Sequence, residues 1–465
     1  MKLAIIGGGI SGLTAAWQAR KDGIEFELFE ASPKFGGILQ TMHLDENCVA
    51  EEGAESCLRS KPELLDLCHE LGLEDEIVST IPENAGAFVV RGGQLHPIPQ
   101  GFRLMAPSSW WPFVRSDLIS WPGKIRAGLD LFLPVKERTP DTPEESLSEF
   151  VTRRLGSEVL HYLAQPLVAG IYGADPQLLS LEATMPLFQR LEQEHGSVIK
   201  GLRALGTEGS AHGARYNLFF SLKKGFGDVV RALVEQLPAE SLHAGAMVDD
   251  LRRKDGGGWQ LEVRGRGVQD FDAVIVALAA PQAARLLQSA APDVSELLGS
   301  IHCRGAVTVN ICYDRHTYLE FVPRAYGFVV PAEERRPVLA CTFSSRKWPN
   351  RGSEKQGVLR TYFGGPGMEW ALTADDEDLL EISKAELSEL LKLNEEPLSY
   401  YVHRWPVGLP EYRIGHRDLV RSVRNKVELL PGLELAGNYM DGVGLPDCVR
   451  LANKAVSAVS AALTV

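Results

Sequence analysis

The first 30 residues follow a strand, helix, strand pattern of apolar and polar positions. Lys2–Ile6 is an apolar run, Leu13–Arg20 repeats its apolar residues at helical spacing, and Phe26–Glu30 is a second short apolar run. Alternation with a period of two is typical of strands, and a period near 3.6 is typical of helices. The pattern predicts a β-strand, an α-helix and a second β-strand at the start of the chain.

Helices are predicted in the following 180 residues. Leucine spacing with Pro62 near the start indicates a helix within Ser60–Glu76, and a helical pair is predicted over Thr142–Tyr172. Thr142-Pro143-Glu144-Glu145 has the pattern of a helix N-terminal cap. Leu202–Tyr216 is polar and contains several glycines and alanines, which predicts a loop at a domain boundary.

Most other segments are strand-like. The predicted elements are a strand pair Ala87–Arg91 and Gln94–Pro97 turning at Gly92-Gly93, a helix Asp228–Gln236, a strand Ala246–Leu251, a hairpin at Trp259–Arg264, an apolar strand Phe271–Ala279 and a strand-rich stretch Ile301–Arg404 with one helix, Ser383–Leu393. A final strand near Leu435 precedes a helix over Cys448–Leu463.

A glycine loop stands between the first strand and the first helix. It reads Gly7, Gly8, Gly9, Ile10, Ser11 and Gly12, and the second strand ends at Glu30. In this context the glycines allow a tight turn, close approach to a pyrophosphate and close helix packing, while the acid accepts hydrogen bonds from a ribose. The alternative is an ordinary glycine turn. The joint placement of loop, strands and acid predicts dinucleotide binding.

A second glycine pair favours FAD over a nicotinamide cofactor. Ala31, Lys34, Gly36, Gly37 and Ile38 follow Glu30, and an extended flavin dinucleotide needs such a second close approach with a cation nearby. Near the C-terminus the corner residues are Gly437, Asn438, Val443, Gly444 and Leu445. Backbone N–H groups at that helix start can stabilise negative charge on a reduced flavin. A plain loop and an ordinary docking helix are the alternatives.

The predicted fold is α/β (α+β). A Rossmann-like FAD-binding domain is built from discontinuous segments and is joined by a strand-rich substrate domain and a helical cap subdomain. The predicted segments are 1–84, 216–280 and 405–465 for the FAD-binding domain, 85–98 and 281–404 for the substrate domain, and 99–215 for the cap. Val248 is predicted at the adenine edge, and Ala279-Ala280-Pro281 near the flavin.

Charge and cysteine content narrow the function. The 48 Lys and Arg residues stand against 61 Asp and Glu residues, a net charge of −13, which argues against a nucleic-acid partner. The seven cysteines are scattered without a Cys-x-x-Cys pair, which favours reduced thiols, no cysteine-based metal site and a cytoplasmic location. We identify no signal peptide and no apolar stretch of membrane-spanning length.

Residues 99–134 are too apolar for a plain loop. Trp110, Trp111, Phe113 and Trp121 lie there among basic residues. One interpretation is the core of a helical subdomain, and the other is a surface that meets a membrane or admits the substrate. Peripheral association with the inner face of the membrane is therefore left open, and so is a homodimer.

Several strings together resemble the oxygen-dependent, FAD-containing protoporphyrinogen/coproporphyrinogen oxidase family over nearly the whole chain. Beyond the N-terminal glycine loop, the resemblance rests on Gly170-Ile171-Tyr172-Gly173-Ala174-Asp175-Pro176, His403-Arg404-Trp405-Pro406, Pro410-Glu411-Tyr412 with Gly415-His416, Gly437-Asn438 and Gly442-Val443-Gly444-Leu445. It implies non-covalent FAD bound by the residues above together with Gly53, Ala54, Glu55, Ser56, Val248 and Trp405.

The resemblance also implies the activity. A porphyrinogen would lose six electrons in three successive transfers to the flavin, with dioxygen as acceptor and hydrogen peroxide as by-product, in heme biosynthesis. Because aromatisation drives the reaction, the protein mainly positions the ring and excludes water, and no catalytic dyad is required. His403 and His416 are accordingly expected to be structural.

Two positions bear on the substrate. The resemblance places Glu55 and Ala87 where protoporphyrinogen-type members often carry an asparagine and a propionate-binding arginine. Glu55 with Ser56 slightly favours coproporphyrinogen III, with protoporphyrinogen IX as the alternative. Substrate contacts are expected at Glu55, Ala87, Gly170 and Tyr172, and the candidate propionate-binding cations are Arg59, Arg91, Lys200 and Arg203.

Two rival functions share the same nucleotide loop. An amine oxidase or carotenoid desaturase would need only the generic glycine motif. A lipid-carrier protein of the same fold without flavin is a non-enzymatic alternative, which the intact glycines disfavour.

Overall fold

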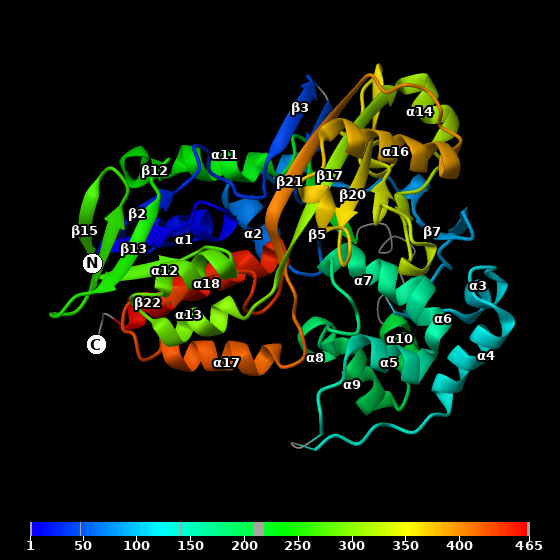
Figure 1. The fold of residues 1–465 in the computed structure, drawn as a ribbon, viewed down its shortest axis with the longest axis horizontal. Helices are drawn as coiled ribbons and strands as arrows, with labels where there is room; N and C mark the ends of the chain where they lie inside the picture. Colours follow the sequence, from blue (N-terminus) through cyan, green and yellow to red (C-terminus); the bar gives the residue numbers. More distant parts are fainter. Residues whose placement is uncertain (1, 47, 104, 140–141, 208–217, 463–465) are drawn as a thin grey trace.

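A computed structural model describes residues 2–46, 48–103, 105–139, 142–207 and 218–462. Figure 1 shows three bodies: a parallel sheet with its helices at one end of the long axis, and towards the other end a second sheet that lies above a group of helices. Both termini lie at the end that carries the parallel sheet. The protein is therefore of mixed α/β class, as predicted.

The parallel sheet combines strands that are far apart in the sequence. Its order is β12 (Leu242–Ala244), β2 (Glu25–Glu30), β1 (Lys2–Ile6), β16 (Ala273–Val276) and β22 (Leu433–Leu435), and every neighbouring pair is parallel. Strands from the predicted segments 1–84, 216–280 and 405–465 all contribute. Parallel sheets bury both faces, which explains why β1 and β16 are almost wholly apolar.

Two layers cover this sheet. One face packs against the helices α1 (Ile10–Lys21), α2 (Glu63–Glu70), α11 (Gly227–Gln236) and α18 (Leu445–Ala462). The other face packs against α12 (Ala280–Leu287), α13 (Pro292–Gly299), α17 (His416–Val427) and the antiparallel sheet of β13 (Val248–Arg253), β14 (Trp259–Val263) and β15 (Gly267–Phe271).

A seven-stranded sheet forms the second body. Its order is β21 (Ser399–Pro410), β17 (Cys303–Asp314), β20 (Gln356–Gly364), β19 (Ala340–Thr342), β18 (Gly327–Val329), β7 (Phe88–Arg91) and β8 (Gln94–Pro97). The predicted hairpin at Gly92-Gly93 is present, and both glycines have positive φ values of 58° and 72°. Its flanking helices are α14 (Arg315–Phe321), α15 (Ser344–Lys347) and α16 (Asp376–Leu391).

The helical body has its own buried core. It consists of α3 (Trp110–Arg115), α4 (Trp121–Gly128), α5 (Leu147–Leu155), α6 (Ser157–Val159), the π-helical turn η4 (Leu160–Ala164), α7 (Gln165–Tyr172), α8 (Leu181–Thr184), α9 (Pro186–His195) and α10 (Val198–Thr207). Smaller strand groups are β3 (Thr41–Asp45) with β4 (Cys48–Glu51), β9 (Phe102–Arg103) with β10 (Ala106–Pro107), and β11 (Phe219–Leu222) between β5 (Cys57–Leu58) and β6 (Ile77–Ser79).

Several predicted helices differ from those observed. The helix within Ser60–Glu76 is shorter, because α2 ends at Glu70 and only a 3₁₀ turn, η1 (Glu74–Glu76), follows. The predicted helical pair over 142–172 is divided into α5, α6, η4 and α7. The predicted loop over 202–216 was wrong for residues 202–207, which belong to α10, and its remainder, residues 208–216, lies outside the described residues.

The predicted helix cap at Thr142–Glu145 is also wrong. The capping box is formed four residues later, by Ser146 and Glu149 at the start of α5. Glu144 instead accepts hydrogen bonds from Ser180 and from the backbone of Gly415, and Glu145 pairs with Arg153. Glu144 and Glu145, the two acids of the predicted cap, therefore form tertiary contacts and do not cap a helix.

In the second half of the chain, several observed helices and strands begin or end at other residues than predicted. The expected strand over 271–279 is divided between the end of β15 and β16, and α12 begins at Ala280. The stretch 301–404 contains α14 and α15 besides one long helix, which begins at Asp376 rather than Ser383. The final helix begins at Leu445 rather than Cys448.

Two expected domain boundaries also shift. α12 and α13 pack on the parallel sheet, although they lie within the segment 281–404 that was expected to form the substrate domain. β21 stays in the seven-stranded sheet as far as Pro410, beyond the expected boundary at residue 404. The seven cysteines are all free, and six of them are buried.

Candidate functional site: converging glycine turns and a cavity

The first glycine turn brings α1 directly onto the end of β1. Gly7 has a φ of 107°, which side-chain-bearing residues rarely adopt. A Cβ atom on Gly12 would collide with the carbonyl oxygen of Gly7. The helix therefore approaches the loop more closely than any residue with a side chain would allow, as a dinucleotide-binding turn requires.

Glu30 lies at this turn. Its carboxylate accepts hydrogen bonds from the backbone N–H of Gly8 (2.6 Å) and of Ser32 (2.8 Å). The backbone N–H of Ala246 donates to the Glu30 carbonyl (2.8 Å), which brings the chain just before Val248 to the same place. Val248, predicted at the adenine edge, is half-buried here.

The second glycine pair contacts the first. Gly36 N–H donates to the Gly8 carbonyl at 2.8 Å, and a Cβ atom on Gly37 would lie 3.3 Å from the Cα of Gly9. Ile38 follows, and a Cβ atom on Gly53 would overlap the Ile38 carbonyl oxygen. Three glycine turns from the first 56 residues therefore converge, with Ala31 and Lys34 exposed beside them.

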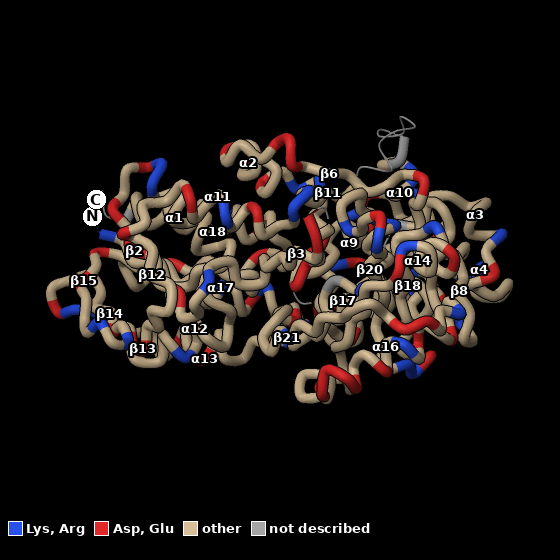
Figure 2. Tube along the Cα trace, turned by 90° about the horizontal axis from the view of Figure 1, so that it is seen from above, with Lys and Arg blue, Asp and Glu red and all other residues tan. Residues whose placement is uncertain are grey.

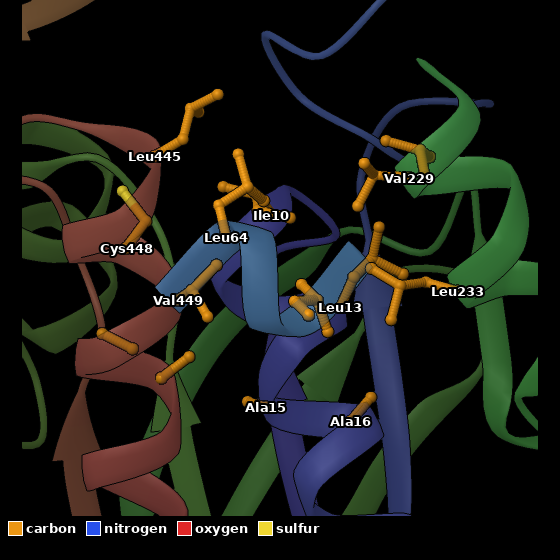
Figure 3. Packing of buried hydrophobic residues seen from close by; sticks show 14 of the residues in the cluster. Ile10, Leu13, Ala15, Ala16, Leu64, Val229, Leu233, Leu445, Cys448 and Val449 are labelled. Atoms are coloured by element: carbon orange, nitrogen blue, oxygen red, sulfur yellow. The ribbon is translucent and has the colours of Figure 1, made fainter. Parts of the chain in front are cut away.

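The N-terminal ends of α1 and α18 pack together. Ile10 and Leu13 of α1 share one buried cluster with Leu445, Cys448 and Val449 of α18, as Figure 3 shows. Lys61 and Asp447, in the first turn of α18, form an ion pair at 2.6 Å. The two glycine-bearing segments from opposite ends of the sequence are therefore neighbours.

Tyr412 holds the C-terminal glycine corner. Its hydroxyl donates to the carbonyl of Asn438 at 2.5 Å and accepts from the N–H of Gly442 at 2.8 Å. The ring stacks on His416, with centroids 4.0 Å apart. Burial lowers the pKa of His416 to about 4. The imidazole is therefore neutral at physiological pH and serves as a packing partner for Tyr412.

The turn at Gly53 is fixed to the seven-stranded sheet. The Glu52 carbonyl accepts from Thr308 (3.1 Å), from Arg360 (2.9 Å) and from the indole N–H of Trp405 (3.0 Å). These three donors lie on the neighbouring strands β17, β20 and β21. Trp405, expected at the cofactor, therefore holds the backbone that carries Gly53 to Ser56.

Glu55 has a partly buried cationic partner that sequence analysis did not identify. Ser344 donates to its carboxylate at 2.6 Å, and Lys347 Nζ lies 3.6 Å from it while donating to the Ser56 hydroxyl at 2.6 Å. Burial alone would raise the pKa of Glu55, but Lys347 and Arg360 outweigh it and lower the pKa. The carboxylate is therefore ionised and its charge is compensated.

A cavity of about 540 Å³ lies between α7 and the loops that follow β18 and β20. Gly173, Ala174, Asp175 and Pro176, the second half of the string quoted for the resemblance, line it. The opposite wall is made by residues 330–333 and 335–339, by residues 364–368 and by Trp370. Pockets of 300–1,000 Å³ are typical of small-molecule sites.

None of the four substrate residues expected from the sequence is in the wall of this cavity. Gly170 is exposed, with open space around its Cα, and the Tyr172 hydroxyl donates to the Thr184 carbonyl at 3.2 Å. Glu55 is occupied as described above, and Ala87 is half-buried at the start of β7. Of the described residues, the basic side chains that line the cavity are those of Arg335, Arg336 and His161, and none of Arg59, Arg91, Lys200 and Arg203 is among them.

The residues of the three glycine turns and the C-terminal corner fit an extended flavin dinucleotide. Backbone segments approach one another closely at the glycines, the Glu30 carboxylate lies at the first turn, and the start of an 18-residue helix adjoins that turn, as the binding of a dinucleotide would require. Lys347 and Arg360 escaped sequence analysis because only the tertiary fold brings them to Glu55.

Comparison with known proteins gives the same assignment. Residues 10–460 match the family described as flavin containing amine oxidoreductase. The coproporphyrinogen III oxidase of Bacillus subtilis (strain 168) is 33% identical over 465 residues, covering 98% of this chain and 97% of the relative. The coproporphyrinogen III oxidase of Staphylococcus aureus (strain NCTC 8325 / PS 47) is 30% identical and covers 99% of each chain.

A solved structure matches over the same length. The crystal structure of a protein assigned as a protoporphyrinogen oxidase, from Exiguobacterium sp. 255-15, has a TM-score of 0.87 at 30% identity and covers 100% of this chain and 99% of that one. The fold and the glycine turns define a flavoprotein oxidoreductase. The chain belongs to the flavin-containing amine oxidoreductases, in their protoporphyrinogen/coproporphyrinogen oxidase family, and its cofactor is FAD.

Proposed function

We propose that this protein oxidises coproporphyrinogen III to coproporphyrin III in heme biosynthesis. The reaction removes six electrons in three steps, with dioxygen as acceptor and hydrogen peroxide as by-product. One observation carries the proposal: the string Gly173 to Pro176 lines a cavity of about 540 Å³ at the junction of the helical body and the seven-stranded sheet. The full-length similarity to two proteins named coproporphyrinogen III oxidase supports it.

We further propose which residues hold the cofactor and which domains they belong to. FAD, when bound, accepts the electrons and protons removed from the substrate. The residues that would hold it non-covalently are Gly7, Gly8, Gly9, Ile10, Ser11, Gly12, Glu30, Ala31, Lys34, Gly36, Gly37, Ile38, Gly53, Ala54, Glu55, Ser56, Val248, Trp405, Gly437, Asn438, Val443, Gly444 and Leu445. They come from all three segments of the proposed FAD-binding domain.

In this proposal the protein's residues bind and orient the substrate, and none of them has to act as a strong base. Aromatisation of the ring drives the reaction, so binding and orienting the substrate matter more than a strong base. His416 is 5% exposed and stacked on Tyr412, and His403 lies beside Glu52 at 3.3 Å. Neither imidazole lines the cavity, which supports the expectation that both are structural.

The test compares two substrates. The purified yellow holoprotein is given coproporphyrinogen III or protoporphyrinogen IX in air, and initial rates are followed by porphyrin fluorescence with peroxide measured in parallel. We expect faster turnover of coproporphyrinogen III. A large preference for protoporphyrinogen IX would establish the alternative substrate, which the similarity to the Exiguobacterium structure favours. Flavin bleaching by amines or polyenes alone would refute both.

We also propose that one end of the helical body binds a membrane surface. Trp111, Trp121, Ile125 and Phe132 are 73%, 64%, 66% and 83% exposed, although Phe113 in the same stretch is fully buried. The buried Phe113 agrees with the interpretation as a subdomain core, and the exposed side chains support the proposal of a membrane-binding surface. Exposed tryptophans beside basic side chains are typical of interfacial anchors, and the exposed Arg115 guanidinium lies 5.9 Å from the Trp111 ring. Among the described residues, no helix is both long and apolar enough to cross a bilayer.

Vesicle sedimentation tests this surface. The holoprotein is mixed with vesicles of phosphatidylcholine alone or with added phosphatidylglycerol, and a Trp121→Ser/Phe132→Ser variant is compared with the wild type. We expect binding to the anionic vesicles that the variant loses, while its FAD content is unchanged. Equal sedimentation of both proteins would refute the proposal, and so would a concentration-dependent dimer that the variant abolishes without any vesicle binding.

A further inference from the structure

Two neighbouring arginines line the cavity, and only one of them is neutralised. Arg336 donates to Glu386 at 3.0 Å and also to Glu389, and these carboxylates raise its pKa. Arg335 is exposed, and among the described residues no carboxylate forms an ion pair with it. The positive charge of Arg335 therefore remains available to an anion that enters the cavity.

The backbone at Arg335 is left-handed. It follows the short 3₁₀ turn η6 (Ala332–Glu334) with a φ of 51°, and Lys392 is the one other non-glycine residue with a positive φ in the described part of the chain. Glycine or asparagine adopts this conformation more readily than arginine. The backbone conformation does not favour an arginine at this position. We therefore look for a role of the arginine side chain itself.

The η6 turn is fixed to the seven-stranded sheet on one side and to the helical body on the other. Glu334 accepts hydrogen bonds from the backbone N–H of Gly92 (2.8 Å) and Gly93 (3.2 Å) at the β7–β8 turn. On the other side Ala332 N–H donates to Gln165 at 3.1 Å, and His161 lies 3.2 Å from Glu333. Arg335 is therefore held at a defined place between the seven-stranded sheet and the helical body.

The other charged groups of the cavity already have partners. Glu333 pairs with His161, and Asp175 accepts from the backbone N–H of Gln177 at 2.9 Å. Ala87, at the position where the resemblance implies an arginine in protoporphyrinogen-type members, immediately precedes β7, which pairs with β18, and offers no charge. Of the charged side chains lining the cavity, Arg335 is the one with no partner among the described residues.

We propose that Arg335 binds a propionate carboxylate of the tetrapyrrole at the rim of this cavity, an inference that rests on the function proposed above. A guanidinium can bind a carboxylate through two parallel hydrogen bonds, which fixes the orientation of the ring as well as its affinity. Strands β7 and β18 run parallel to each other. Ala87 precedes one end of this strand pair, whereas Arg335 follows the other end, so the proposed carboxylate contact lies at the end of the pair opposite Ala87.

The test removes this charge in the holoenzyme. Arg335→Gln and Arg335→Gly are compared with the wild type, and the glycine variant removes the side chain while relieving the left-handed backbone. We expect KM for coproporphyrinogen III to rise about 10- to 100-fold with kcat within about twofold, because the lost charge-assisted bonds act in binding. Arg335→Lys should recover part of the affinity.

Two further measurements separate recognition of charge from damage to the fold. Lys392→Gln is the matched control, because it removes a cation from a left-handed position outside the cavity, and its KM should equal that of the wild type. The tetramethyl ester of coproporphyrinogen III carries no carboxylates, so its KM should be the same for the wild type and both Arg335 variants.

The outcomes distinguish the two proposals. If the wild type oxidises no porphyrinogen, the proposed function fails. If the wild type is active and the Arg335 variants keep its KM, or lose affinity for the ester and the acid alike, the assignment of Arg335 fails while the proposed function stands.

Discussion

At the scale of single residues, buried polar groups hold the backbone that surrounds the site. Tyr412 joins Asn438 to Gly442 through one hydroxyl, and His416 supports its ring by stacking. The sequence placed both residues in a family-specific string but gave no reason for their proximity to the glycine corner. That reason is tertiary, because 26 positions separate Tyr412 from Asn438.

The buried His416 makes stability depend on pH. Its pKa is about 4 in the folded protein and near 6.5 when unfolded, so the unfolded state binds the proton first as the pH falls. The contribution is therefore complete above pH 6.5 and is lost progressively towards pH 4. We expect the free energy of unfolding to fall by about 2 kcal/mol from this group between pH 7.5 and about pH 5.

Urea unfolding of the wild type and His416→Phe at these two pH values checks this. The phenylalanine preserves the stacking ring and cannot take up a proton, so the variant should show a smaller fall in stability on acidification. The exposed His316 offers a control, and His316→Gln should follow the wild type. Identical pH dependence of His416→Phe and wild type would contradict the assignment.

At the scale of elements, close packing of α1 on β1 is the feature on which cofactor binding depends. The sequence predicted it correctly, because strand, glycine loop, helix and acid are local in the chain. The cap before α5 was mispredicted, because Glu144 is drawn to Ser180 and Gly415 by contacts that no local pattern contains. A sequence pattern predicts a structural element reliably when the residues that it contacts are close in the sequence.

The glycine at position 12 can be tested directly. A methyl group there would collide with the Gly7 carbonyl, so Gly12→Ala should push α1 away from the turn and leave a protein with little or no bound FAD. The measurement is the ratio of flavin to protein absorbance after purification. Gly256→Ala is the control, since a methyl group at Gly256 meets open space, and it should retain wild-type FAD and stability within about 0.5 kcal/mol. A yellow, fully loaded Gly12→Ala variant would contradict this account.

At the scale of the whole molecule, a buried ion pair joins segments that lie far apart in sequence. Arg351 and Glu51 are fully buried, and their side chains meet at 3.0 Å. Arg351 also donates to the Ser221 hydroxyl at 2.9 Å, and Glu51 accepts from the backbone of Phe226 at 2.9 Å. The pair therefore connects the regions around residues 51, 221 and 351.

Removing one partner should be costly. Arg351→Met leaves the Glu51 carboxyl buried without its counter-charge, so we expect a loss of about 3–5 kcal/mol in the free energy of unfolding. Adding Glu51→Gln removes the uncompensated charge and should restore a large part of that loss. Urea unfolding followed by tryptophan fluorescence measures both. Lys384→Met, at an exposed pair with Glu396, should cost less than about 1 kcal/mol.

If the double variant were as unstable as Arg351→Met alone, packing rather than charge would explain the loss of stability.

The distribution of charge over the molecule bears on how the substrate is bound. Figure 2 shows acidic and basic residues interspersed along the chain in this view, and the net charge is −13, so the positive charge that meets an anionic substrate has to be local.

The sequence by itself determined the features that arise within short stretches: the strand, glycine loop and helix from Lys2 to Lys21, the acid Glu30, the β7–β8 hairpin and the long C-terminal helix. Their physical causes, periodicity, glycine conformation and turn geometry, act between neighbours in the chain. Only the tertiary structure decided that Lys347 and Arg360 compensate Glu55, and that Arg335 lines the cavity with a charge that no carboxylate of the described residues neutralises. These properties depend on which charges meet after folding, and no local pattern contains that information.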